Sequence, residues 1–430
     1  MRPRHRRGAQ EQRRKLRAVL LCAVGTGNTG NDQSLLTAVR LFDEARPGAR
    51  FLVATPHVEG ARELLRLPVI PIRQSKTTFV GLTSRTSIVR AIICGEIRRF
   101  LKMYRLLRTA DLTVVTGTGI FDDFGEKPWT MPYALLSWAS LSRLVNRPFC
   151  FMSVGAGPVQ NRLIRWEFAA AARLATSVSY RDRGSQEFMS EIGAGRGDAR
   201  VAPDIAFATE RPSTRPAEPT AEHLVVGVGV MAYGGWSAPT ASGPVYDHYV
   251  QCIAKVVAQL TRDGHMVELL VGQPCDLQMV NDVIASSGGP SEQLTVPSIL
   301  DFPALLGAVG RTDVVIATRY HNLVAALMME RPVVSLSYAP KNQDLLASIG
   351  VRDFDRSIEE ATPEWILQRF AVIRSGRSDF NRRAWDTVAG WPNDIREELG
   401  RVLGCVERET APPASSTART GGLIGGPADS

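Results

Sequence analysis

Short apolar runs alternate along this chain with longer stretches in which apolar residues recur every three or four positions. The first pattern predicts buried β-strands, and the second predicts amphipathic helices. In the first half of the chain, helices are predicted over residues 86–108 and 129–146, and strands over residues 18–24, 51–54, 112–116 and 149–154. Strands that alternate with helices are typical of a parallel sheet covered by helices on both faces.

A segment with repeated prolines interrupts this alternation. Residues 209–222 show no apolar periodicity, which predicts a linker between two domains. A second alternating series follows, with strands expected over residues 224–230, 266–271, 313–318 and 333–337. The economical architecture is therefore α/β, with two doubly wound, Rossmann-like domains facing one another across a cleft.

The same patterns give a domain plan. Residues 18–208 are predicted to form the N-terminal α/β domain, and residues 223–375 the C-terminal α/β domain. Residues 376–405 are expected to be a helical segment that crosses back to brace the first domain. The two ends, residues 1–17 and 406–430, lack the material for a core and are predicted to be disordered.

The net charge of +8 is concentrated at the N-terminus. Residues 1–17 contain eight Arg or Lys residues and one acid, Glu11, so the rest of the chain is nearly neutral. Because that remainder does not interleave aromatic with basic residues as base-stacking surfaces do, no nucleic-acid partner is expected. The basic segment is interpreted either as a solubilising leader or as an arm in peripheral contact with anionic lipid at the inner face of the membrane.

Other features of the sequence bear on its location. No apolar run approaches the roughly 18 residues that a membrane-spanning helix requires. The apolar stretch 18–24 leads into Gly-Thr-Gly-Asn and not into a small-residue cleavage site, so a first strand explains it better than a signal peptide. The six cysteines are scattered without paired spacing, which predicts reduced, buried thiols in a cytoplasmic protein.

The segment 313–341 contains the most informative candidate chemistry. A buried strand is expected to end there at Arg319 and His321, just before a helix over residues 322–330. Open α/β sheets bind ligands at such carboxyl ends of strands, where free backbone N–H groups favour anions. The next strand delivers Lys341 to the same rim, so the sequence predicts a site for a small, multiply charged anion.

The glycine-rich turn 25–30 matches a dinucleotide-binding turn in spelling and in context. However, the next strand, 51–54, is not followed by a carboxylate that would bind a ribose hydroxyl. This absence argues against a nicotinamide cofactor. Close packing of the first helix on its strand explains the glycines equally well.

Two further strand ends carry polar residues. Asp122 and Asp123 follow a predicted strand, and either one can hydrogen-bond a sugar hydroxyl or act as a base on it. Arg181 follows a short strand and can form a bidentate contact with a carboxylate or a phosphate. The competing interpretations are structural: helix-capping or solvated aspartates, and an Arg181–Asp182 pair that fixes the loop.

Taken in order along the chain, these motifs resemble the polysaccharide pyruvyl transferase family. The resemblance spans about residues 20–350 and rests on Gly27-Asn28-Thr29-Gly30-Asn31-Asp32, residues 117–123, Ser179-Tyr180-Arg181-Asp182 through Ser185, Pro203-Asp204, Thr318-Arg319-Tyr320-His321, Arg331-Pro332 and residues 338–341. Members resemble GT-B-type glycosyltransferases in fold. They move pyruvate from phosphoenolpyruvate onto a sugar of a cell-surface or secreted polysaccharide, usually as a ketal.

The resemblance implies roles for individual residues. His321 and Arg319 match the Arg-x-His element of the family and are expected to be catalytic. The residues expected to bind substrate are Arg181, Lys341, Asp122, Asp123, Asn28 and Asp32. No metal and no cofactor are expected, apart from phosphoenolpyruvate as the donor substrate.

The chemistry of this donor agrees with the residues. Phosphoenolpyruvate carries a carboxylate and a phosphate on a compact skeleton, so its site requires several cations away from water. Ketal formation also needs a proton for the methylene carbon and a sugar hydroxyl that attacks the neighbouring carbon. His321, expected to titrate near neutrality, is the candidate acid or base. Its structural alternative is a helix N-terminal ring that bonds a nearby carbonyl.

Two other functions stay open. A GT-B-type glycosyltransferase that uses a nucleotide sugar suits two facing α/β domains, but it needs a carboxylate to bind the ribose, and near His321 the sequence offers Glu330 alone. A noncatalytic protein that binds anionic surfaces through residues 1–17 would leave the cationic rim without a purpose. We expect a pyruvyl transferase that binds a sugar or lipid-linked oligosaccharide acceptor on the N-terminal domain and the donor on the C-terminal domain.

Overall fold

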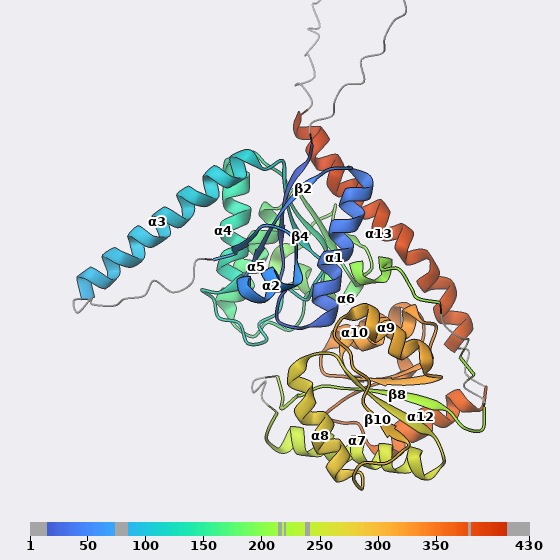
Figure 1. Cartoon of the computed structure of the whole chain (residues 1–430). Helices are drawn as coiled ribbons and strands as arrows, with labels where there is room; N and C mark the ends of the chain where they lie inside the picture. Colours follow the sequence, from blue (N-terminus) through green and yellow to red (C-terminus); the bar gives the residue numbers. More distant parts are fainter. Residues whose placement is uncertain are drawn as a thin grey trace, which may run out of the picture.

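The computed structural model describes residues 15–73, 85–213, 217–218, 221–236, 241–376 and 380–410. Within these ranges the chain forms two stacked α/β domains, each built on a parallel sheet (Figure 1). Most of the predicted basic segment, the C-terminal residues 411–430 and parts of the predicted linker lie outside the described residues. In the described part of 209–222 there is neither a helix nor a strand.

The sheet of the first domain has seven strands in the order β3-β2-β1-β4-β5-β6-β7, and they pair in parallel. The strands are β1 (Arg17–Leu21), β2 (Arg50–Thr55), β3 (Val69–Pro71), β4 (Leu112–Thr116), β5 (Phe149–Val154), β6 (Ser177–Tyr180) and β7 (Arg200–Val201). The helices are α1 (Thr29–Ala45), α2 (Val58–Leu64), α3 (Arg85–Thr109), α4 (Met131–Leu144), α5 (Arg162–Leu174) and α6 (Arg183–Met189). The central strands β4 and β5 are buried along their whole length, because helices cover both faces of the sheet.

The sheet of the second domain has six parallel strands in the order β10-β9-β8-β11-β12-β13. The strands are β8 (Val225–Val230), β9 (Met266–Val271), β10 (Leu294–Thr295), β11 (Val314–Ala317), β12 (Val333–Ser337) and β13 (Asp355–Ser357). The helices are α7 (Pro244–Arg262), α8 (Leu277–Ser286), α9 (Phe302–Arg311), α10 (Tyr320–Met328), α11 (Pro340–Ser348) and α12 (Pro363–Arg374). In both sheets the strand order reverses beside the first strand, which makes both domains doubly wound and confirms the predicted fold class.

A long helix, α13 (Phe380–Thr410), joins the two domains. At its start Phe380 packs on Phe354 of the second domain, with ring centroids 5.3 Å apart. Further along, Trp391 packs on Phe207 of the first domain at 4.5 Å, and Figure 1 shows α13 running beside α1. The predicted return to the first domain is therefore observed. The predicted end of the helical segment at residue 405 is wrong, because the helix continues to Thr410.

Two predicted element boundaries differ from the structure in the candidate site. The helix expected from residue 322 begins at Tyr320, so His321 belongs to its first turn and Arg319 is its N-cap residue. The first strand, expected to reach residue 24, ends at Leu21, ahead of the turn in which Gly25 takes a φ of 84°. The edge strands β3, β10 and β13 have only two or three residues each, which is too short for a periodicity to appear.

Two other properties of the described chain relate to the sequence predictions. Among the described helices, none has both the length and the apolar content needed to cross a membrane. The six cysteines are free thiols; Cys275 is exposed and Cys94 is partly so, which corrects the expectation that the thiols are buried.

Candidate active site

A cavity of about 230 Å³ lies between the domains, where the carboxyl ends of the two sheets meet. The first domain contributes Asn28, Thr29, Asn31, Gly119, Asp122, Phe124 and Arg181, from the segments after β1, β4 and β6. The second domain contributes Met231, Trp236, Gly272, Gln273, Arg319, Tyr320, His321, Asn322, Tyr338 and Lys341, from the segments after β8, β9, β11 and β12. Both strand-order reversals face this cavity, which is where doubly wound sheets bind ligands.

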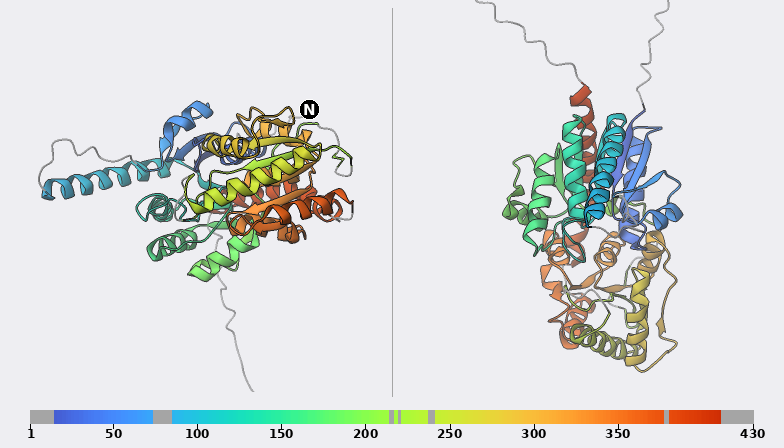
Figure 2. Two further views of the ribbon diagram at one scale, coloured as in Figure 1. Left: turned by 90° about the horizontal axis from the view of Figure 1, so that it is seen from below. Right: turned by 90° about the vertical axis from the view of Figure 1, so that its left-hand side faces the viewer.

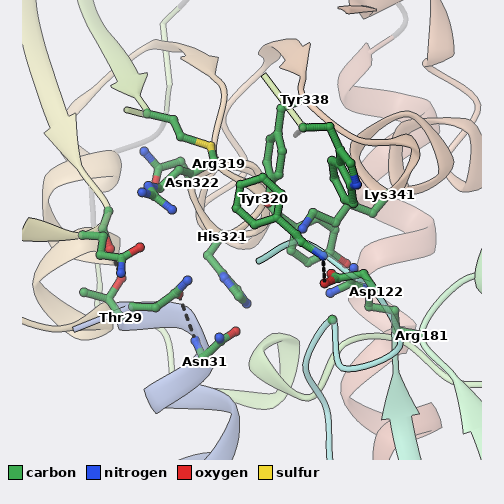
Figure 3. A pocket seen from close by; sticks show the side chains of 17 residues that line it. Thr29, Asn31, Asp122, Arg181, Arg319, Tyr320, His321, Asn322, Tyr338 and Lys341 are labelled. Atoms are coloured by element: carbon green, nitrogen blue, oxygen red, sulfur yellow. Dashed lines mark hydrogen bonds between the residues drawn. The ribbon is translucent and has the colours of Figure 1, made fainter. Parts of the chain in front are cut away.

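His321 belongs to the second domain, lines the cavity and contacts the first domain through its imidazole ring. Its ring packs against Gly30 in the first turn of α1 so closely that a Cβ atom added to Gly30 would lie 1.8 Å from the ring Cγ. Figure 3 shows the ring directed toward the segment that carries Thr29 and Asn31. The Nε2 atom is buried and has no hydrogen-bond partner among the described residues. Such an atom is available to a ligand in the cavity.

The charge state of His321 differs from the sequence prediction. Burial, together with the positive charges of Arg181, Lys341 and Arg319, lowers its pKa to about 3. The expectation that His321 titrates near neutrality is therefore wrong for the unliganded protein. The imidazole is neutral across the physiological range, so it is a proton acceptor and not a proton donor.

Arg319 is held by a buried carboxylate that the sequence analysis missed. Its Nη2 atom donates to Oδ1 of Asp276 at 2.6 Å, and its Nε atom donates to Oδ2 of the same residue. Asp276 is fully buried and also accepts the backbone N–H of Ala232 at 3.0 Å. The stem of Arg319 passes over Gly272, where a Cβ atom would lie 2.5 Å from its Cδ. Asp276 follows β9, so a search for carboxylates at every strand end would have found it.

Arg181 is the buried cation of the first domain. Its side chain is only 2% exposed and forms ion pairs with Asp182 at 3.3 Å and Asp204 at 3.6 Å. The guanidinium carbon lies 4.2 Å from the ring centroid of Tyr320 in the other domain, a cation–π contact. Arg181 thus forms the predicted structural pair with Asp182 and also lines the cavity.

Lys341 and Asp122 lie on the side of the cavity where Figure 3 also shows Arg181. The Nζ atom of Lys341 lies 4.5 Å from the ring centroid of Tyr338. One oxygen of Asp122 accepts the backbone N–H of Phe124 at 3.3 Å. Burial raises the pKa of Asp122, although the charges of Lys341 and Arg181 oppose that shift. The environment therefore favours the protonated carboxyl more than it does for an exposed aspartate.

The other predicted substrate-binding residues divide into two kinds. Asn28 lines the cavity and also caps α1, because its Oδ1 accepts the N–H of Asn31 at 3.3 Å. Asp32 and Asp123 do not line the cavity. The Asp32 carboxylate accepts the N–H of Gly25 at 2.9 Å, and Asp123 accepts the N–H groups of Gln160 and Asn161 at 2.6 and 3.1 Å. This placement favours structural roles for both, as the competing interpretation of Asp123 proposed.

An aromatic pair from both domains also lines the cavity and was not found in the sequence. The rings of Phe124 and Trp236 lie 5.0 Å apart, and the Trp236 indole donates to Asp123 at 3.4 Å. Trp236 comes from the loop after β8, where no local pattern marks it. Among the described residues, no group of three or more His, Cys, Asp or Glu side chains is arranged to hold a metal ion.

The contact between Gly30 and His321 gives a first prediction. In Gly30→Ala the new methyl group overlaps the His321 ring, so we expect the free energy of unfolding to fall by about 1–3 kcal/mol, as overpacking does. Gly400→Ala in α13 is the matched control, because its Cβ meets nothing within 4 Å. Urea unfolding measures both. Equal stability of the two variants would show that the interdomain contact is not tight.

The lowered pKa of His321 gives a second prediction. In the unfolded chain this histidine takes up a proton below about pH 6.5, whereas in the folded protein it stays neutral down to about pH 3. The folded state therefore loses stability as the pH falls through this window, by about 2 kcal/mol between pH 6.5 and 5. His321→Gln should reduce the measured loss by that amount. The free energy of unfolding, measured against pH, tests this prediction. The same decrease with falling pH in the parent and in His321→Gln would contradict the lowered pKa of His321.

Several solved structures share the fold of this chain. The Anabaena protein HepE, solved in complex with UDP and glucose, is 14% identical, with a TM-score of 0.56 over 90% of this chain and 99% of its own. The UDP-GlcNAc 2-epimerase from Neisseria meningitidis, bound to UDP-GlcNAc, is 9% identical, with a TM-score of 0.55 over 91% and 100%. The UDP-GlcNAc 2-epimerase from Methanocaldococcus jannaschii is 9% identical, with a TM-score of 0.56 over 91% and 99%. At these identities the likeness shows the fold alone, and that fold is GT-B-like.

The sequence comparisons identify the family. None of the curated proteins matches the chain. The family model described as polysaccharide pyruvyl transferase matches residues 28–340, a range that includes the cavity-lining residues of both domains up to Tyr338. The enzyme described here therefore belongs to the polysaccharide pyruvyl transferase family.

Proposed function

We propose that this enzyme transfers pyruvate from phosphoenolpyruvate onto hydroxyl groups of a sugar in a cell-envelope polysaccharide or its lipid-linked precursor, as a ketal. The observation that carries the proposal is the convergence of Arg181, Arg319 and Lys341 on one cavity around the neutral ring of His321. Three cations in a partly desolvated space match a donor that carries both a carboxylate and a phosphate.

The size of the cavity supports a compact donor. Its volume of about 230 Å³ is below the roughly 300–1,000 Å³ of sites for drug-sized ligands. A three-carbon phosphorylated acid fits this space better than a complete nucleotide sugar does. Glu330, the carboxylate considered for a ribose, lies beyond the far end of α10, pairs with Arg211 at 3.4 Å and does not line the cavity.

The pKa of His321 is lowered and that of Asp122 is raised, so a neutral imidazole can act as the base and a protonated carboxyl as the acid. We assign Asp122, whose pKa burial raises, as the donor of a proton to the methylene carbon of phosphoenolpyruvate. We assign neutral His321 as the base that takes the proton of the attacking sugar hydroxyl. A new C–O bond then forms at the central carbon. A second hydroxyl attacks that carbon as its bond to the phosphate oxygen breaks, and phosphate leaves with the electron pair. The Asp122 carboxylate, which has given up its own proton, takes the proton of this second hydroxyl.

The acceptor sugar is assigned to the side of the cavity formed by the first domain. Phe124 of the first domain, with Trp236 of the second domain packed beside it, provides aromatic faces on which the apolar face of a sugar ring can stack. Asn28 and Asn31 line the same space and can bond hydroxyl groups. We infer that the donor lies mainly on the second domain, which contributes Arg319 and Lys341, and that it also reaches Arg181 of the first domain. We further infer that the enzyme acts in the cytoplasm, as the sequence predicts.

A binding experiment tests the donor. Phosphoenolpyruvate should raise the melting temperature, and Lys341→Gln should weaken its binding at least about tenfold by removing one charge from the cavity. Arg262→Gln, an exposed substitution in the second domain, is the control and should bind as the parent does. Isothermal titration calorimetry measures the affinities. Stabilisation by a UDP- or GDP-sugar, without any by phosphoenolpyruvate, would support the glycosyltransferase alternative.

A kinetic experiment tests the assigned roles. Asp122→Asn and His321→Gln should each lower phosphate release from phosphoenolpyruvate about 100-fold or more in the presence of acceptor, as expected for loss of a general acid or base. Both variants should still bind the donor. Single-turnover assays with a panel of sugar and lipid-linked acceptors measure the step. Full turnover in either variant would remove that residue from the mechanism.

A further inference from the structure

Helix α3 carries an apolar ridge that no described residue covers. Figures 1 and 2 show this helix projecting from the first domain, beyond the other helices. Its C-terminal half packs on the domain through Met103 and Leu107, which are buried. Toward the N-terminal end of the helix, Val89, Ile93, Ile97 and Leu101 follow at four-residue intervals and are 54%, 53%, 54% and 49% exposed. Residues at this spacing share one side of a helix, so they form a continuous ridge.

The surroundings of this ridge are basic. The exposed residues Arg90, Arg98, Lys102 and Arg105 belong to the same helix. Its acidic residue, Glu96, is already engaged, because it accepts Nε of Arg99 at 2.9 Å and the hydroxyl of Tyr133 at 3.1 Å. An approaching surface therefore meets apolar side chains flanked by positive charges.

Such a ridge differs from ordinary surface apolar residues. Single exposed leucines or isoleucines are normal, whereas a contiguous exposed row on a projecting element marks an interaction site. Basic residues beside an apolar stripe are typical of helices that lie in the plane of a membrane surface. The flanking cations also oppose self-association, because a two-fold contact of this face with a second copy brings the same positive charges together.

We infer that α3 docks the enzyme on an anionic lipid bilayer, with the ridge inserted at the boundary between headgroups and acyl chains. The arginine and lysine side chains contact the headgroups, and the four apolar side chains enter below them. The docking does not depend on which donor the cavity binds. It does bring the enzyme to the surface where a lipid-linked acceptor resides.

Vesicle co-sedimentation of the full chain tests this inference. Vesicles of phosphatidylglycerol and phosphatidylcholine should bind the protein, more weakly at high salt, while pure phosphatidylcholine should bind it less. The double variant Ile93→Asn/Ile97→Asn should lose at least about tenfold in partitioning, since it removes two apolar groups from the interface. Leu277→Asn/Leu300→Asn is the matched control, because both leucines are exposed in the second domain, at 50% and 87%.

Three outcomes would overturn the inference. The parent protein could fail to bind anionic vesicles at all. The ridge variant could bind as tightly as the parent, which would assign any binding to another part of the chain, such as the basic N-terminal segment. Light scattering could show a parent oligomer that the ridge variant dissociates while vesicle binding stays unchanged, which would make this face an interface between copies. Equal melting temperatures of the parent and the ridge variant confirm that folding is unaffected.

Discussion

Mutual repulsion of three cations in one interdomain cavity is the constraint that the surrounding structure must satisfy. Arg319 is stabilised by the buried carboxylate of Asp276, and Arg181 by Asp182 and Asp204. The three carboxylates do not line the cavity, whereas both arginines do. The counter-charges therefore fix the cations in place and leave a positive surface toward a ligand. Replacing such a counter-charge would leave a buried cation without compensation, which costs several kcal/mol in other proteins.

The same constraint explains why the two domains must be held at one separation. The imidazole of His321 belongs to one sheet and contacts Gly30 of the other, and Arg181 stacks on Tyr320 across the same boundary. A small relative movement of the domains would separate these groups. Helix α13, packed on Phe354 at one end and on Phe207 further along, connects the two cores into one buried apolar cluster. Helix α13 and the contacts in the active site thus both hold the two domains at one separation.

The likeness to UDP-binding enzymes concerns the scaffold and not the ligand. In this enzyme two doubly wound domains present the carboxyl ends of their strands to a common space, and the side chains at those ends decide the chemistry. In this enzyme the rim carries Arg181, Arg319 and Lys341, whereas the carboxylate considered for a ribose, Glu330, lies outside the cavity.

The sequence by itself determined the architecture and most of the cationic rim. The strands over residues 112–116 and 333–337 were predicted correctly because burial on both faces leaves a continuous apolar run. Strand ends in open α/β sheets are ligand sites for topological reasons, so Arg181, Arg319 and Lys341 could be selected from their position alone.

Only the tertiary structure decided which of these side chains meet and in which charge state. The role of Asp276, the aromatic pair Phe124 and Trp236, and the packing of His321 on Gly30 join residues that are far apart in the sequence. The pKa of His321 depends on burial and on three cations contributed by both domains, none of which a local pattern encodes. The exposure of the α3 ridge could not be predicted from the sequence either, because an apolar stripe on a helix normally indicates a buried face. Only the structure shows that no described residue packs against this stripe.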